Sequence, residues 1–186
     1  MNLGQMMLVI AALSILGILV LNANRTVFET NDTQNQSEFG INAVSLATSI
    51  VEEAMGKMYD EAIADSNTGE LADPIQLTPA GGLGREGAEA YRDGANDFND
   101  FDDFNSLFLV YKSPVDSLVT AGTDREVVVP GIRDRYFVRT KVEYVSDAAP
   151  DVAVAARTWH KKMTVTVTSS STRDTLVYPA LMSYWN

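Results

Sequence analysis

The first apolar stretch of the chain has no polar side. Residues 6–21 read MMLVIAALSILGILVL, in which no side chain is charged and Ser14 is the one polar side chain. As a helix, this stretch would extend roughly 24 Å at 1.5 Å per residue, slightly less than the ~30 Å hydrocarbon layer of a bilayer. The uncharged residues 22–24 lengthen it. The pattern therefore predicts a helix that is apolar all round and able to enter a membrane.

Apolar residues return further along the chain, now on one side of a helix. They recur at spacings of three and four, with acidic residues and a lysine largely on the other side. Such a stripe is typical of a helix that packs on the core of a domain. The residues that we expect to face a sheet are Ala43, Ala47, Ile50, Ala54 and Met58.

The segment between these two patterns, residues 25–38, is rich in Asn, Thr and Gln. Asn and Thr compete for backbone hydrogen bonds, which makes this segment a candidate for non-helical structure. No proline precedes Pro74, so helix could extend over about 2–64, and residues 65–69 (DSNTG) supply a stop. The helical region is thus predicted in three parts: 1–24, 25–38 and 39–64.

The rest of the chain favours strands. A glycine- and Asp-rich loop region, 65–107, precedes a region, 108–186, with alternating apolar and polar positions. Strands are predicted at 108–111, 126–129, 136–145, 162–168 and 176–185, with turns at 148–151 and 169–172. Pro179 favours an edge position for the last strand. The fold class is therefore α+β: a long hydrophobic-to-amphipathic N-terminal helix followed by a C-terminal antiparallel sheet domain.

Composition removes several kinds of chemistry. The 186 residues include no cysteine and one histidine, which excludes disulfides, thiolate metal sites and metal sites with two histidines from one chain. The formal net charge is −11 and no basic run is present, so no nucleic-acid partner is expected. His160 has no nucleophile or orienting partner identifiable from spacing. We therefore expect no enzyme.

One acidic segment, NDFNDFDDFN at 96–105, allows two interpretations. Its aspartates could bind calcium through oxygen ligands. Its phenylalanines recur every three residues, which instead favours a short helical turn with the rings inward and the carboxylates in solvent. The candidate calcium ligands are Asp97, Asp100, Asp102 and Asp103, and no other cofactor is expected.

The order of these elements resembles the type IV pilin and pseudopilin superfamily, and Asp102-Asp103-Phe104-Asn105 is similar to a stretch in some pilin-like proteins. In that family, a basic leader ends in Gly and a Glu stands fifth after it. Here no basic residue precedes Gly4, and Val9 stands at the fifth position. No acidic residue occurs before Glu29, so we expect the N-terminal helices to pack by apolar contact alone.

The resemblance implies a structural subunit of an extracellular, pilus-like helical filament. Such a subunit is membrane-anchored before assembly, interacts with an inner-membrane pilus-type assembly machinery and polymerises with copies of itself. The residues that would form the filament core or membrane helix are Met6, Met7, Leu8, Val9, Ile10, Leu13, Ile15, Leu16, Gly17, Ile18, Leu19, Val20 and Leu21.

Other functions remain open. The same segment could be a single anchor for a surface binding or adhesion protein, for a virion membrane component or, more distantly, for a hydrolase. A cleaved signal peptide is disfavoured, because MNLGQ has no Lys or Arg and residues 21–23 (LNA) form a poor cleavage site. We expect the segment to be retained, with its N-terminal end inside and the acidic body outside.

Overall fold

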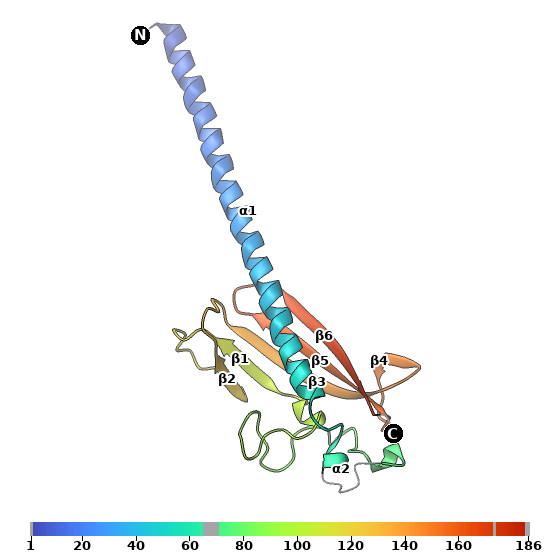
Figure 1. Ribbon diagram of the computed structural model, residues 1–186. Helices are drawn as coiled ribbons and strands as arrows, with labels where there is room; N and C mark the ends of the chain where they lie inside the picture. Colours follow the sequence, from blue (N-terminus) through green and yellow to red (C-terminus); the bar gives the residue numbers. More distant parts are fainter. Residues whose placement is uncertain (1, 65–70, 173, 185–186) are drawn as a thin grey trace. The chain divides into compact units, whose positions relative to one another are not determined.

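A computed structural model describes residues 2–64, 71–172 and 174–184 of the chain (Figure 1). A long N-terminal helix, α1 (Leu3–Met55), is followed by a six-stranded, mostly antiparallel sheet, which confirms the predicted α+β class. The chain divides into two units, Met1–Phe39 and Gly40–Asn186. The first unit is helix, and the second contains the last turns of α1, the loops and the sheet.

Helix α1 continues without interruption through residues 25–38, which the sequence left as a candidate non-helical segment. Arg25 and Glu29 form an ion pair of 2.8 Å one helical turn apart. Hydroxyl groups in this segment donate to the carbonyl oxygen four residues earlier, at distances of 2.8–3.0 Å: Thr26, Thr30, Thr33 and Ser37. The polar side chains therefore bond to the helix itself, instead of competing with it for backbone groups.

The helix ends earlier than predicted, at Met55 instead of near residue 64. The backbone of Met58 pairs with another segment: Met58 N–H donates to Asn99 O at 3.1 Å, and Phe101 N–H donates to Met58 O at 2.9 Å. These bonds replace the helical ones, and only a short helix, α2 (Glu61–Ala64), follows. The predicted stop at 65–69 lies outside the described residues.

The strands largely follow the prediction, in the order β2-β1-β3-β5-β6, with β4 paired to β3. Pro179 lies on β6, which is an edge strand, as predicted. The strands are β1 (Phe108–Lys112), β2 (Arg125–Val128), β3 (Tyr136–Ser146), β4 (Ala149–Ala153), β5 (His160–Ser169) and β6 (Thr175–Ser183).

Two features of the sheet differ from the prediction. Strand β2 runs parallel to β1, because residues 113–124 carry the chain back before it pairs again, as a parallel connection requires. Residues 148–151 were predicted as a turn, but β4 begins at Ala149 and pairs with the end of β3. The local alternation of apolar and polar residues predicts neither feature, because both depend on which strand still has an unpaired edge where another strand can bind.

One face of the sheet is buried under the last turns of α1. The inward residues of β3 and β5 alternate with outward ones, and register pairs Val138 with Val167 and Val142 with Met163. The Asn42 amide donates to the Tyr136 hydroxyl at 3.1 Å. Four predicted face residues are fully buried: Ala43, Ala47, Ile50 and Ala54. The fifth was wrong, because Met58 lies beyond the end of α1 and is 53% exposed.

Replacing Ala47 by Leu should lower the free energy of unfolding by about 1–3 kcal/mol, because the added side chain must enter a fully buried position. Urea unfolding followed by tryptophan fluorescence measures the change. Ser49→Leu, on the exposed side of the same helix, is the matched control and should change stability by less than about 0.5 kcal/mol. Equal losses in the two variants would contradict the assignment of the buried face.

Candidate functional site

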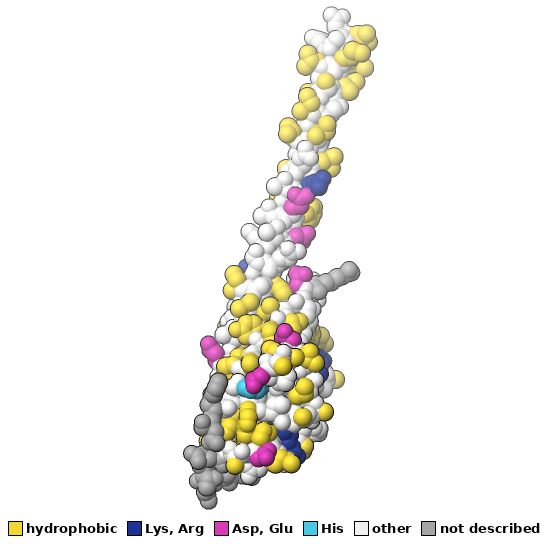
Figure 2. Space-filling model, turned by 90° about the vertical axis from the view of Figure 1, so that its right-hand side faces the viewer, with side chains coloured by type: hydrophobic (Ala, Val, Ile, Leu, Met, Phe, Trp, Pro, Cys, Tyr) yellow, Lys and Arg dark blue, Asp and Glu magenta, His cyan; other side chains and the backbone are white. Residues whose placement is uncertain are grey.

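The first candidate site is the apolar segment of α1. Its large apolar side chains, from Leu3 to Leu21, have exposed fractions between 49% and 76%. Figure 2 shows apolar side chains along the visible face of this segment. Among the described residues, one helix, α1, is long and apolar enough to cross a membrane, and its most apolar window contains no buried side chain. The exposed apolar residues are Leu3, Met6, Met7, Leu8, Val9, Ile10, Leu13, Ile15, Leu16, Ile18, Leu19, Val20 and Leu21.

Small residues lie on one side of this segment. Ala11, Ser14 and Gly17 follow one another at intervals of three, which places them on neighbouring positions of one helix face. The Ser14 hydroxyl donates to Ile10 O at 2.9 Å, so its hydrogen-bonding need is met within the helix. A Cβ atom added at Gly17 would meet no atom within 4 Å. Such a face lets a second helix approach closely in an apolar medium.

The second candidate site surrounds a lysine in the core of the second unit. Lys161 of β5 is fully buried, and its ammonium group lies 2.7 Å from Asp60 Oδ2 and 2.5 Å from Asp102 Oδ1. It also donates to Tyr59 O at 2.8 Å and lies 4.6 Å from the centre of the Tyr59 ring. The three charged groups form a buried ion network that joins β5 to the segments after α1 and before β1.

Asp60 is held by further donors. Thr78 donates to its carboxylate from both the backbone N–H, at 3.1 Å, and the hydroxyl, at 3.0 Å. The Tyr144 hydroxyl lies 3.3 Å from Asp60 Oδ2. The Asp60 carboxylate therefore has several donors besides Lys161, as a buried charge requires.

Three of the four aspartates of the segment 96–105 are buried and only Asp97 is partly exposed, which corrects the favoured sequence interpretation. Asp100, Asp102 and Asp103 are each 0% exposed. The predicted inward position of the rings is confirmed, since Phe98, Phe101 and Phe104 are buried as well. In the turn η2 (Asp102–Phe104), the carboxylates are covered as well as the rings, because Asp102 contacts Lys161 of β5 and Asp103 lies near Glu86 and Glu89.

These aspartates hold the turn through reciprocal bonds. Asp103 Oδ2 accepts from the backbone N–H groups of Asn99, at 2.9 Å, and Asp100, at 3.1 Å. Asp100 Oδ1 accepts from Asp103 N–H at 3.0 Å. Asp97 lies apart from this arrangement: its Oδ1 accepts from the backbone N–H groups of Arg92 and Phe98. The four predicted calcium ligands therefore do not form one site.

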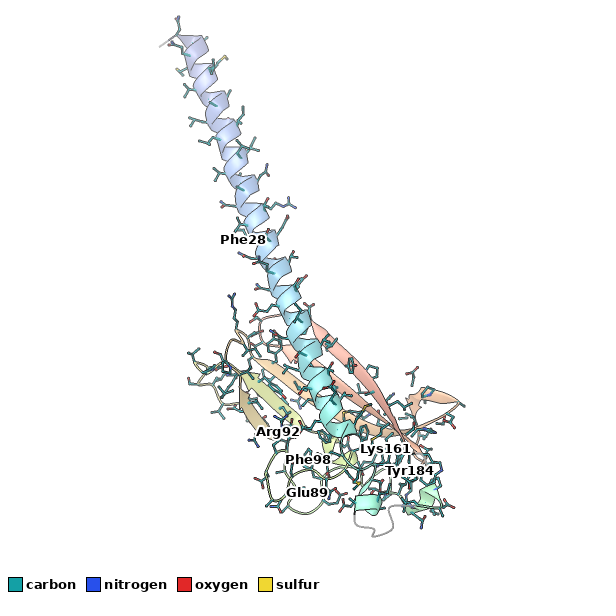
Figure 3. The ribbon with its side chains drawn as sticks, in the orientation of Figure 1. Phe28, Glu89, Arg92, Phe98, Lys161 and Tyr184 are labelled. Atoms are coloured by element: carbon teal, nitrogen blue, oxygen red, sulfur yellow. The ribbon has the colours of Figure 1, made fainter. Side chains whose placement is uncertain are left out.

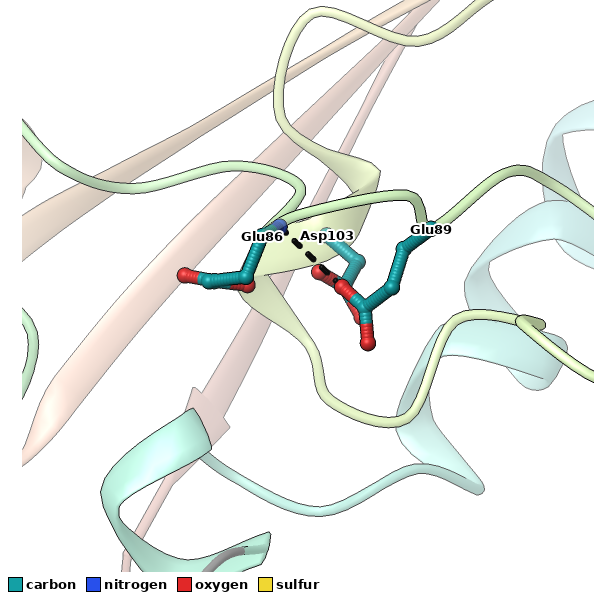
Figure 4. Close-up of side chains that lie close together, drawn as sticks. All are labelled: Glu86, Glu89 and Asp103. Carbon is teal, nitrogen blue, oxygen red and sulfur yellow. Dashed lines mark hydrogen bonds between the residues drawn. The ribbon is translucent and has the colours of Figure 1, made fainter.

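A different set of carboxylates converges on Asp103. One carboxylate oxygen from each of Glu86, Glu89 and Asp103 lies within 4.8 Å of the other two (Figure 4). Glu86 N–H donates to Glu89 Oε2 at 3.1 Å. Gly87, with φ of +58°, adopts the left-handed conformation that turns the loop between the two glutamates. We call Glu86, Glu89 and Asp103 the acidic cluster.

Burial and mutual repulsion raise the pKa values in this region. Burial, together with the charges of Asp103 and Asp102, raises the pKa of Glu86 to about 8. Burial, with the neighbouring Asp103, raises the pKa of Glu89 to about 7. Burial and the charges of Asp102 and Asp103 raise the pKa of Asp100 to about 9. The ionised forms of these carboxyls are thus disfavoured unless a cation accompanies them.

Lys161, Asp60 and the two glutamates were not among the site residues predicted from the sequence. The sequence does contain an indication for Lys161. It alternates in step with Met163, Val165 and Val167, and alternate residues of a strand lie on the same face, here the inward one. The glutamates had no such indication, because a glycine-rich loop has no period. Figure 3 shows Lys161 and Glu89 at the same end of the second unit.

No protein-family model, curated protein or solved structure matches this chain.

Proposed function

We propose that this protein is a structural subunit of an extracellular, pilus-like helical filament and that it polymerises through residues 6–21 of α1. The observation that carries the proposal is an apolar helix surface, exposed on every side. The segment contains ten Leu, Ile and Val residues, and burying each is worth roughly 1.5–3 kcal/mol. Such a surface requires a bilayer or a bundle of similar helices.

A bundle of copies accounts for both units. In it, the apolar segments form the core, and the units from Gly40 onward, which carry most of the acidic residues, form the shell. A contact of this kind joins different surfaces of successive subunits, so it leads to an open helical polymer instead of a closed ring. The membrane holds the subunit before assembly, and a pilus-type machinery of the inner membrane extracts it.

Helix packing would rest on apolar contact. The family resemblance implies a Glu at the position that Val9 occupies, and no acidic residue precedes Glu29. Close approach along Ala11, Ser14 and Gly17 supplies dispersion contacts in its place.

The alternative is a surface binding protein with a single membrane anchor. The length and apolarity of α1 support this alternative as well as they support the filament proposal, because such a helix fits a lipid bilayer. The two proposals differ in whether the helices of many copies meet each other, and this difference is open to a direct test.

Gly17→Leu should abolish or strongly reduce filaments while leaving the protein in the membrane. The added side chain separates neighbouring helices, whereas Leu contributes about −0.3 to −0.6 kcal/mol to insertion. Negative-stain electron microscopy of material sheared from cells counts the filaments, and membrane fractionation measures insertion.

Leu19→Ile, which conserves volume and apolarity, is the control and should assemble normally. Normal filaments from Gly17→Leu would contradict close packing at this position. The absence of filaments from the unaltered chain, in cells that carry a pilus-type machinery, would favour the single anchor.

A further inference from the structure

We propose that the acidic cluster, Glu86, Glu89 and Asp103, is a calcium-binding site. The proposal concerns the second unit and does not depend on filament assembly.

The geometry suits one ion. Calcium binds oxygen ligands at 2.3–2.6 Å, so two oxygens on the same ion lie at most about 5 Å apart. One oxygen from each of the three carboxylates lies within 4.8 Å of the others, which is inside that limit (Figure 4). A single calcium ion can therefore contact all three side chains with little movement.

A buried oxygen without a partner points to a ligand independently of the clustering. Asp103 is 0% exposed, and its Oδ2 is held by the N–H groups of Asn99 and Asp100. Its Oδ1 accepts no hydrogen bond from a nitrogen or hydroxyl donor among the residues that the structure describes. An unsatisfied buried carboxylate oxygen is costly, and a bound cation would supply the missing interaction. Glu86 Oε2 also lacks a donor among these residues.

No basic side chain in the described part of the chain pairs with these carboxylates. Among the ion pairs formed by the described residues, none involves Glu86, Glu89 or Asp103. The nearby ammonium of Lys161 is already bound by Asp60 and Asp102. No basic side chain among the described residues therefore offsets the charge that these three carboxyl groups acquire when they ionise.

Access and ligand type favour calcium over magnesium. Glu86 and Glu89 are partly exposed, so an ion can enter from solvent and keep water molecules on that side. Magnesium usually binds one or two carboxylates and demands octahedral geometry, whereas calcium accepts several, each through one or two oxygens. Two glutamates from one loop, together with Asp103, supply the several carboxylates that calcium accepts.

The bound ion would tie the loop that carries Glu86 and Glu89 to the turn η2. That turn also contains Asp102, a partner of Lys161. Calcium would therefore stabilise the second unit as a whole, by linking a glycine-rich loop to its buried ion network.

Isothermal titration of the full-length protein in detergent with CaCl₂, after treatment with a chelator, tests the site. We expect binding of one ion. The melting temperature should rise by roughly 5–10 °C when calcium is 100-fold above its dissociation constant. Glu86→Gln with Glu89→Gln should weaken binding at least 10-fold, because the neutral amides remove two negative charges from the site. The amides preserve the size of the side chains and the acceptor for Glu86 N–H. Asp103 is left unchanged, because it also holds the turn.

The matched control is Glu52→Gln with Asp93→Asn, which removes the same charge from exposed positions and should bind calcium normally. The absence of both heat and a thermal shift at millimolar calcium would overturn the proposal. Equal binding by the Glu86/Glu89 double variant would overturn the assigned position. Magnesium binding as tight as calcium binding would overturn the choice of ion.

Discussion

Deletion of residues 2–24 should convert the protein into a soluble monomer that forms no filaments. The deletion removes the continuous apolar surface of α1, whereas the core that Ala43, Ala47, Ile50 and Ala54 share with the sheet lies within the second unit and stays complete. Under the proposed function, filament formation should therefore be lost completely, and the second unit should still unfold cooperatively. Analytical ultracentrifugation and electron microscopy measure the two properties.

A helix exchange separates the proposed function from simple anchoring. Replacing residues 6–21 by an unrelated apolar helix of the same length, without small residues, preserves a membrane anchor. Under the filament proposal this chimera inserts but does not polymerise. Filaments from either the deletion or the chimera would show that residues 6–21 are not the polymerising element. If the protein is instead a surface binding protein, both variants should retain its binding activity.

The second large effect is expected from Lys161→Met, which should lower the free energy of unfolding by about 3–5 kcal/mol. The substitution leaves Asp60 and Asp102, both fully buried, without their cation. Such a loss is large beside the 5–15 kcal/mol of total stability that is typical of a domain. Urea unfolding measures it, with Lys141→Met on β3 as the control, because the Lys141 side chain is 66% exposed.

A combined variant identifies the cause of this loss. Adding Asp60→Asn and Asp102→Asn to Lys161→Met removes the stranded charges, so part of the lost stability should return. A Lys161→Met variant as stable as Lys141→Met would contradict the buried ion network. Equal instability of the single and triple variants would show that packing, and not charge, dominates at this position.

Much of the fold was predictable because its signals are local. The period of two placed β3 and β5, and the spacing of three and four placed the buried face of α1, except for Met58. The end of α1 was not predictable from periodicity. Met58 keeps a helical spacing in the sequence, but its backbone pairs with Asn99 and Phe101, which are distant in the chain.

The chemistry of the second unit depends on long-range contacts. Lys161 stands 101 residues after Asp60 and 59 after Asp102, and no local pattern relates them. The predicted calcium candidates were chosen as neighbours in the sequence, yet Asp97 caps a backbone turn while Asp103 meets two glutamates of a loop. Carboxylates gather according to how the loops fold over η2, and not according to spacing.

By itself, the sequence determined the apolar segment, the strand periods and the α+β order, because each follows from residues within a few positions of one another. Only the tertiary structure decided which charges are buried, that β2 runs parallel to β1, and that Glu86 and Glu89 lie against Asp103. The reason is physical: the environment of a charge is set by whatever covers it, and here the covering segments are distant in the chain.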